Sequence, residues 1–159
     1  MKGVKTMKFS FLLIARVIAV LLFLAIAASC VILPPVVKAL CEAGDLSGHR
    51  LTMDDGDVIY VTVMAYLMLA VAALAIVLLW WLLRTVKQGE VFTKKAIGIL
   101  YAVSFCTFGE AILFLSIGTF FQLAIGVTLG ASLLGFSLLV VCEVLKEAAR
   151  IKSENDLTV

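Results

Sequence analysis

The 159-residue chain has little charge and few of the residues that carry enzyme chemistry: charged residues make up 15% of it, and it holds one histidine, two prolines and four cysteines. Soluble domains carry about 25% charged residues. With His49 as the sole histidine, no serine-histidine-aspartate triad can be assembled elsewhere. Walker, His-Glu-x-x-His and nucleophile-elbow motifs are also missing. We therefore expect neither an enzyme nor a cofactor.

Metal and nucleic-acid binding are likewise not indicated. The cysteines form no C-x-x-C pair, which predicts neither a zinc site nor a redox motif. The acidic run 54–57 has Ala65, not glutamate, at the twelfth position of a calcium loop, and this favours a solvated turn that caps a helix. A net charge of +2 gives no reason to expect direct contact with nucleic acid. Cys30 and Cys41 are expected near one face of the membrane, either as a disulfide or as two separate thiols.

Long apolar runs are abundant instead, since hydrophobic residues make up 64% of the chain. Crossing about 30 Å of hydrocarbon at 1.5 Å per residue takes about 20 residues. The runs predict membrane spans at about 10–33, 58–83, 96–116 and 122–145, within a single membrane domain that covers 1–159. A signal peptide is the alternative for the first run, but that run is longer than a signal core and continues past Cys30. Pro34-Pro35 is expected to end the first helix and begin an outer loop, 34–57.

Lysine and arginine are concentrated on one side of this arrangement. The first residues, a loop at 84–95 and a tail at 146–159 hold ten of them, whereas the outer loop holds only Lys38 and Arg50. By the positive-inside rule, the loop, the tail and both termini are cytoplasmic. We therefore predict an all-α integral membrane protein, a four-transmembrane-helix bundle with cytoplasmic N- and C-termini in the plasma membrane.

Glu110 is the one acidic residue set well inside a predicted span. A charge at that depth costs several kcal/mol unless it is paired, hydrated or protonated. One hypothesis is a proton or cation ligand that faces a small polar cavity; the other is a protonated glutamate that packs the bundle by hydrogen bonding. Simple rise arithmetic places four hydroxyl-bearing residues at a similar depth: Ser29, Thr62, Tyr66 and Thr128.

Two further features concern helix packing. Arg16 lies about two turns inside the first span, where it either extends to the inner face or pairs with Glu143 of the last span. The spacing Gly126-x-x-x-Gly130 gives the fourth helix a smooth face for close packing. That face is expected to be used within the bundle, and contact with another copy or another membrane protein is the alternative.

Two segments resemble the bacterial membrane-protein family catalogued as domain of unknown function 2975. One is Gly89-Glu90-Val91-Phe92-Thr93, and the other is the end of the chain, Glu154-Asn155-Asp156-Leu157-Thr158-Val159. The resemblance implies a four-span bacterial plasma-membrane protein and supplies no activity. Family members are often encoded beside a small helix-turn-helix regulator, which implies such a cytoplasmic protein as a possible partner.

Both family-like segments are predicted to be cytoplasmic, where a docking surface would have to be. We therefore expect a regulatory or interaction partner whose contact residues are Phe92, Thr93, Glu154, Asn155 and Asp156. The rival interpretation is structural: Thr93 caps the third helix, and the tail folds back on the loop. Alternative functions are transport or ion handling centred on Glu110, and an accessory subunit of a larger membrane complex that packs through Gly126 and Gly130.

Overall fold

The computed structural model describes residues 2–42, 55–87 and 93–156, and every regular element in those ranges is an α-helix. All four helices are long and apolar enough to cross a membrane. The prediction of an all-α membrane protein with four spanning helices is therefore confirmed. The helices are α1 (Lys2–Glu42), α2 (Asp55–Lys87), α3 (Lys94–Ile117) and α4 (Gln122–Asp156).

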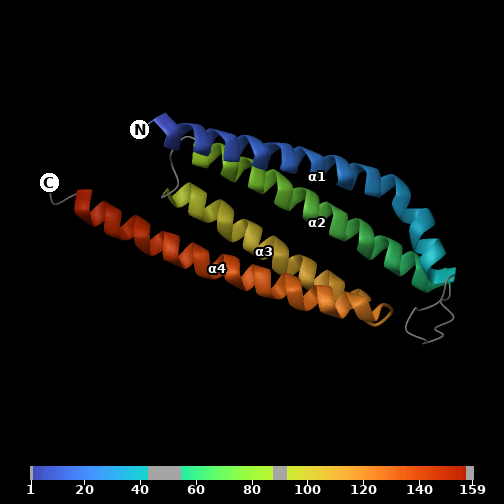
Figure 1. The fold of residues 1–159 in the computed structure, drawn as a ribbon. Helices are drawn as coiled ribbons and strands as arrows, with labels where there is room; N and C mark the ends of the chain where they lie inside the picture. Colours follow the sequence, from blue (N-terminus) through green and yellow to red (C-terminus); the bar gives the residue numbers. More distant parts are fainter. Residues whose placement is uncertain (1, 43–54, 88–92, 157–159) are drawn as a thin grey trace.

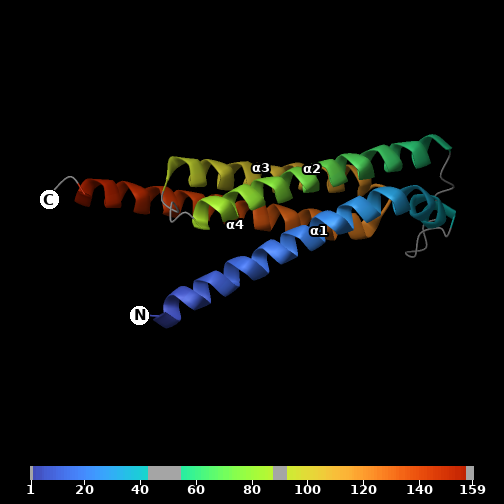
Figure 2. The same cartoon turned by 90° about the horizontal axis from the view of Figure 1, so that it is seen from above.

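The helices run alternately up and down, so both termini lie at the same end of the molecule (Figure 1). Each helix packs against its neighbour in sequence, while α1 and α4 share no interface within the described residues. The N-terminal half of α1 also diverges from the other three helices (Figure 2). The bundle is thus an open row in which α3 and α4 pack most extensively and α1 lies at one edge.

Most of the core lies on α3. Among the described residues, α1, α2 and α4 each have few buried side chains. The helix α3 has a continuous buried strip, which consists of Ala96, Ile97, Ile99, Val103, Ser104, Ala111 and Ile117. Large apolar residues on α1 and α4 are instead mostly exposed. This distribution is typical of membrane helices, because lipid tails are as apolar as leucine and burial between helices gives little hydrophobic gain.

The helix α1 does not end at the proline pair. It runs through Pro34 and Pro35 to Glu42, so the predicted helix end at this position is wrong. Residues 34–42 and 55–57 of the predicted outer loop are helical. Proline has no N–H, so Pro34 cannot bond to the carbonyl of Cys30 one turn earlier. That carbonyl accepts a hydrogen bond from the Tyr66 hydroxyl of α2 at 3.1 Å instead. A neighbouring helix therefore satisfies the group that the proline leaves unpaired.

The helix α3 begins and ends with defined caps. Thr93 has extended backbone geometry, and its side chain accepts a hydrogen bond from the Ala96 amide at 3.3 Å, as an N-cap does. At the other end, the amide of Gly118 donates to the carbonyls of Phe114 and Leu115. The turn to α4 closes with a bond from the Phe121 amide to the Ile117 carbonyl at 3.0 Å.

Candidate functional site

The helices α3 and α4 approach each other closely at Gly135. A Cβ added to Gly135 would lie 2.7 Å from Thr107 Oγ1 and 3.2 Å from the Phe108 ring. Ser104, which is fully buried, donates a hydrogen bond of 2.8 Å to the Gly135 carbonyl. Only glycine allows this approach, and the serine adds a polar link across the interface.

The predicted pair of packing glycines lies elsewhere. Gly126 and Gly130 are exposed, and a Cβ on either would meet nothing within 4 Å. The expected use of this face inside the bundle is therefore not what the structure shows. The sequence does contain the signal for the real contact, because Ala131-x-x-x-Gly135 has the same spacing of small residues as Gly126-x-x-x-Gly130.

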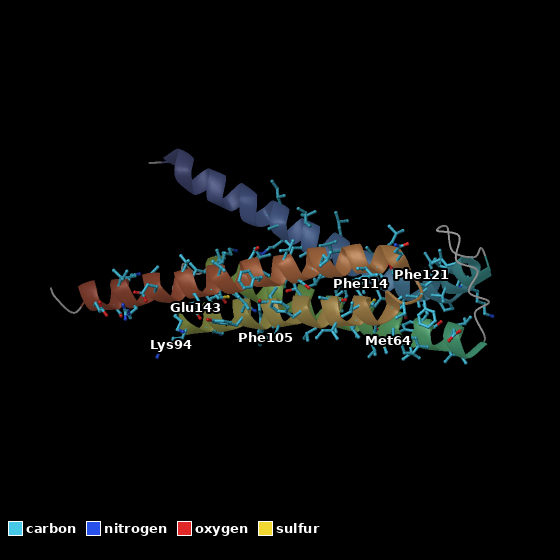
Figure 3. The ribbon with its side chains drawn as sticks, turned by 90° about the horizontal axis from the view of Figure 1, so that it is seen from below. Met64, Lys94, Phe105, Phe114, Phe121 and Glu143 are labelled. Carbon is cyan, nitrogen blue, oxygen red and sulfur yellow. The ribbon has the colours of Figure 1, made fainter. Side chains whose placement is uncertain are left out.

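A polar cluster joins α3 and α4 near the end of the bundle that carries both termini. The Tyr101 hydroxyl donates to Glu143 Oε1, and Lys146 Nζ lies 3.5 Å from Glu143 Oε2. Figure 3 shows Glu143 of α4 at the same end of the bundle as Lys94 of α3. Glu143 is thus shared between an α3 tyrosine and a lysine on its own helix, and the sequence analysis did not identify the tyrosine as its partner.

Arg16 does not pair with Glu143. Its guanidinium carbon lies over the Trp80 ring of α2, 5.7 Å from the ring centroid, and α1 shares no interface with α4 in the described part of the chain. This is the geometry of a cation–π interaction. The sequence had suggested that Arg16 either extends to the inner face or pairs with Glu143, and the structure adds the contact with Trp80.

Glu110 lies on α3 on the same side as the buried strip. Its Oε1 atom is buried and makes no hydrogen bond within the described residues. The predicted polar cavity is not assembled around it, because the four hydroxyls expected at its depth all donate to backbone carbonyls. Ser29 donates to Ala25, Thr62 to Val58, Tyr66 to Cys30 and Thr128 to Ala124.

The final three turns of α4 form a charged helix that extends beyond the start of α3 (Figures 1 and 2). Arg150 forms ion pairs with Glu147 at 2.7 Å and Glu154 at 3.8 Å. On another face, Val144, Ala148 and Ile151 follow one another at helical spacing. Val144 is 62% exposed and Ile151 50% exposed. This end of α4, residues 144–154, is amphipathic, and its apolar stripe is exposed at Val144 and Ile151.

The remaining predicted interaction residues are placed as follows. Thr93 caps α3, as the structural interpretation expected. Glu154 is in the last turns of α4 and pairs with Arg150. Asn155 and Asp156 belong to α4 by backbone. Phe92 and residues 157–159 lie outside the described residues, so the proposed fold-back of the tail is not tested.

The cysteines provide no cross-link between Cys30 and Cys41. Cys30 is a free thiol. Both residues belong to the continuous helix α1, where eleven residues span about 16 Å at 1.5 Å per residue, far more than a disulfide bridges. Among the described residues, no group of three or more histidine, cysteine or acidic side chains is placed to hold a metal ion.

Comparison with known proteins gives a family and nothing finer. The model of a family described as "Protein of unknown function (DUF2975)" matches residues 17–159. No curated protein and no solved structure matches the chain. The matched range begins inside α1 and includes the Tyr66–Cys30 bond, the Gly135 contact and the projecting end of α4.

Proposed function

The chain belongs to the family described as "Protein of unknown function (DUF2975)", and from this starting point we propose that it is a non-enzymatic regulatory or interaction partner in the bacterial plasma membrane. It acts through the end of the bundle that carries both termini. The observation that carries the proposal is the projecting end of α4, a charged helix with an exposed apolar stripe.

The orientation in the membrane is part of this proposal. The bundle end with both termini also holds the end of α2 and the start of α3, and its cations include Arg84, Lys87, Lys94 and Lys95. Lys38 is the cation that α1 contributes near the opposite end. The positive-inside rule supports a cytoplasmic position for the cation-rich end. The projecting end of α4 is then in the cytoplasm.

The chemistry of the projecting helix supports a protein partner. Residues that hold ion pairs on the helix itself occupy one face, so they need no partner to satisfy their charges. Ile151 lies on another face and beyond the predicted span, so it leaves apolar surface exposed to water. An amphipathic helix of this kind docks its apolar face in a groove or against another helix. A small cytoplasmic helix-turn-helix regulator is the partner that the family resemblance favours.

Site-specific photocrosslinking in cells tests the proposal. A photoreactive residue at Ile151 should capture a cytoplasmic DNA-binding protein. The same residue at Lys146, which is five positions earlier and therefore on the far side of the helix from Ile151, is the matched control and should not. Truncation before Ser153 should weaken the capture at Ile151. Equal capture at both positions, or capture of membrane proteins alone, would contradict a regulatory contact at this stripe.

Transport or ion handling centred on Glu110 is the second candidate, and the buried, unpartnered Oε1 atom favours it. A carboxyl oxygen in that position can hold a proton or accept a cation. The test is proton or cation flux into liposomes that contain the purified protein. If this candidate is correct, Glu110→Gln should abolish the flux. The candidate is eliminated if the unchanged protein shows no flux, or if the Glu110→Gln protein shows the same flux as the unchanged protein.

A subunit role in a larger membrane complex is supported by the exposed Gly126 and Gly130 face. Because a Cβ there meets no described atom within 4 Å, the face is open to a helix from another protein or another copy. Gly126→Leu should then reduce co-purification with that partner while leaving the monomer folded.

A further inference from the structure

An apolar groove separates α1 from α2 at the end of the bundle near Arg16. Its volume is about 310 Å³, which is within the range of small-molecule sites. The lining residues include Ala19, Val20 and Phe23 of α1 and Val77, Trp80 and Trp81 of α2. The groove lies where the N-terminal half of α1 diverges from the other helices (Figure 2).

A cation stands at one end of this groove. Arg16 precedes Ala19 by about one helical turn, and its guanidinium carbon is 5.7 Å from the centroid of Trp80, which also lines the groove. The guanidinium forms no ion pair with a carboxylate among the described residues. The contact with Trp80 engages no hydrogen-bond acceptor, so the N–H donors of the guanidinium can still bind an anion.

The depth of the groove matches that of a lipid headgroup and the start of its chain. Trp80 and Trp81 are exposed and are followed one turn later by exposed Arg84, the arrangement found where a helix leaves the hydrocarbon. From Arg16 the groove continues past Val20 and Phe23 on α1, away from the cation-rich end and toward the middle of the span. A ligand here would place an anion beside Arg16 and an apolar chain beyond it.

We propose that the groove between α1 and α2 binds an anionic phospholipid, with its phosphate at Arg16 and one acyl chain along Val20, Phe23 and Val77. Charge complementarity selects this occupant. A helix from a second copy or another protein would have to present an acidic group beside Arg16. Every phospholipid presents a phosphate near the level of interfacial tryptophans such as Trp80, toward which the long Arg16 side chain can extend. The proposal does not depend on the regulatory role of α4.

Native mass spectrometry of the full-length protein in detergent tests the headgroup. Phosphatidylglycerol and phosphatidylcholine with identical acyl chains are the probes. Phosphatidylglycerol adducts should exceed phosphatidylcholine adducts by about fivefold, the effect of one cation at a membrane surface. Arg16→Gln should remove this preference and Arg16→Lys should keep most of it. Lys38→Gln, which removes a cation near the opposite end of α1, is the matched control and should bind as the unchanged protein does.

Val20→Trp tests the groove itself. Val20 is 46% exposed and lines the groove, so the larger side chain fills it without entering the core. Adducts of phosphatidylglycerol should fall by the same factor as in Arg16→Gln, with unchanged far-ultraviolet circular dichroism. Equal adducts of the two lipids on the unchanged protein, or equal phosphatidylglycerol binding by the Arg16→Gln protein, would overturn the proposal. So would a dimer that Val20→Trp dissociates, because the groove would then be an interface between copies.

Discussion

The two halves of the bundle are held together in different ways. Between α3 and α4, the backbone of Gly135 touches Thr107 and Phe108, and the buried Ser104 bonds across the interface. Between α1 and α2, the described links are the hydrogen bond from Tyr66 to Cys30 and the contact of Arg16 with the Trp80 ring, and an apolar groove remains between the helices. The difference shows that apolar side chains alone do not bring helices together in lipid. Small residues and polar links decide which pairs pack closely.

The largest expected effect is at the close contact. Gly135→Leu forces a side chain into space held by Thr107 and Phe108, and overpacking of this kind costs about 1–3 kcal/mol. Gly130→Leu is the matched control on the same helix, because a Cβ at Gly130 meets nothing within 4 Å. Reversible unfolding in mixed micelles should show the loss for Gly135→Leu alone. Equal losses would mean that the Gly135 contact does not hold α3 and α4 together.

The next effect concerns the proline pair in α1. Tyr66→Phe removes the donor to the Cys30 carbonyl, which Pro34 cannot satisfy, and an unsatisfied group in an apolar setting costs about 1–3 kcal/mol. We expect the unfolding free energy to fall toward the lower end of that range, because Tyr66 is partly exposed. Tyr60→Phe is the control, since the Tyr60 ring packs against Phe120 and the substitution keeps the ring. Unchanged stability in Tyr66→Phe would show that α1 tolerates the prolines unaided.

A smaller effect is expected for the serine between α3 and α4. Ser104→Ala removes the bond to the Gly135 carbonyl, and interhelical hydrogen bonds in membranes contribute about 0.6 kcal/mol on average. The loss is smaller than for Tyr66→Phe because Gly135 lies inside α4, where its carbonyl keeps its helical partner. Ser137→Ala is the control, since Ser137 is exposed and bonds only to Leu133 of its own helix. An equal change in unfolding free energy in both proteins would show that the effect comes from the helix propensity of alanine and not from the bond between the helices.

The smallest effect is expected at the projecting end of α4, outside both halves of the comparison. Arg150→Gln breaks the pairs with Glu147 and Glu154, and exposed ion pairs contribute about 0–1 kcal/mol at most. The unfolding free energy should therefore hardly change. A loss above that range would show that this end packs against the bundle, which would weaken its proposed role as a docking helix.

Much of the fold could be predicted from the sequence. The wrong predictions share one cause, which is that they depend on contacts between different helices. Run length and hydropathy predicted four helices, and Thr93 was recognised as a possible N-cap before the structure showed it. The helix end at Pro34 was wrong because the residue that rescues the helix, Tyr66, is 36 positions away from Cys30. Gly126 and Gly130 were chosen over Gly135 because spacing along one helix does not say which side a neighbour occupies.

The sequence by itself determined that the chain is a four-helix membrane protein. In lipid, a spanning segment must satisfy its backbone hydrogen bonds internally, so it has to be a long apolar helix. The length and hydropathy of such a helix depend only on residues that are adjacent in the sequence. The tertiary structure decided which of its polar and small residues meet. It placed Arg16 on Trp80, Tyr101 on Glu143 and Ser104 on Gly135, and it left Glu110 without a hydrogen bond in the described residues. Such pairings depend on the rotation and separation of neighbouring helices, which many apolar sequences satisfy equally well.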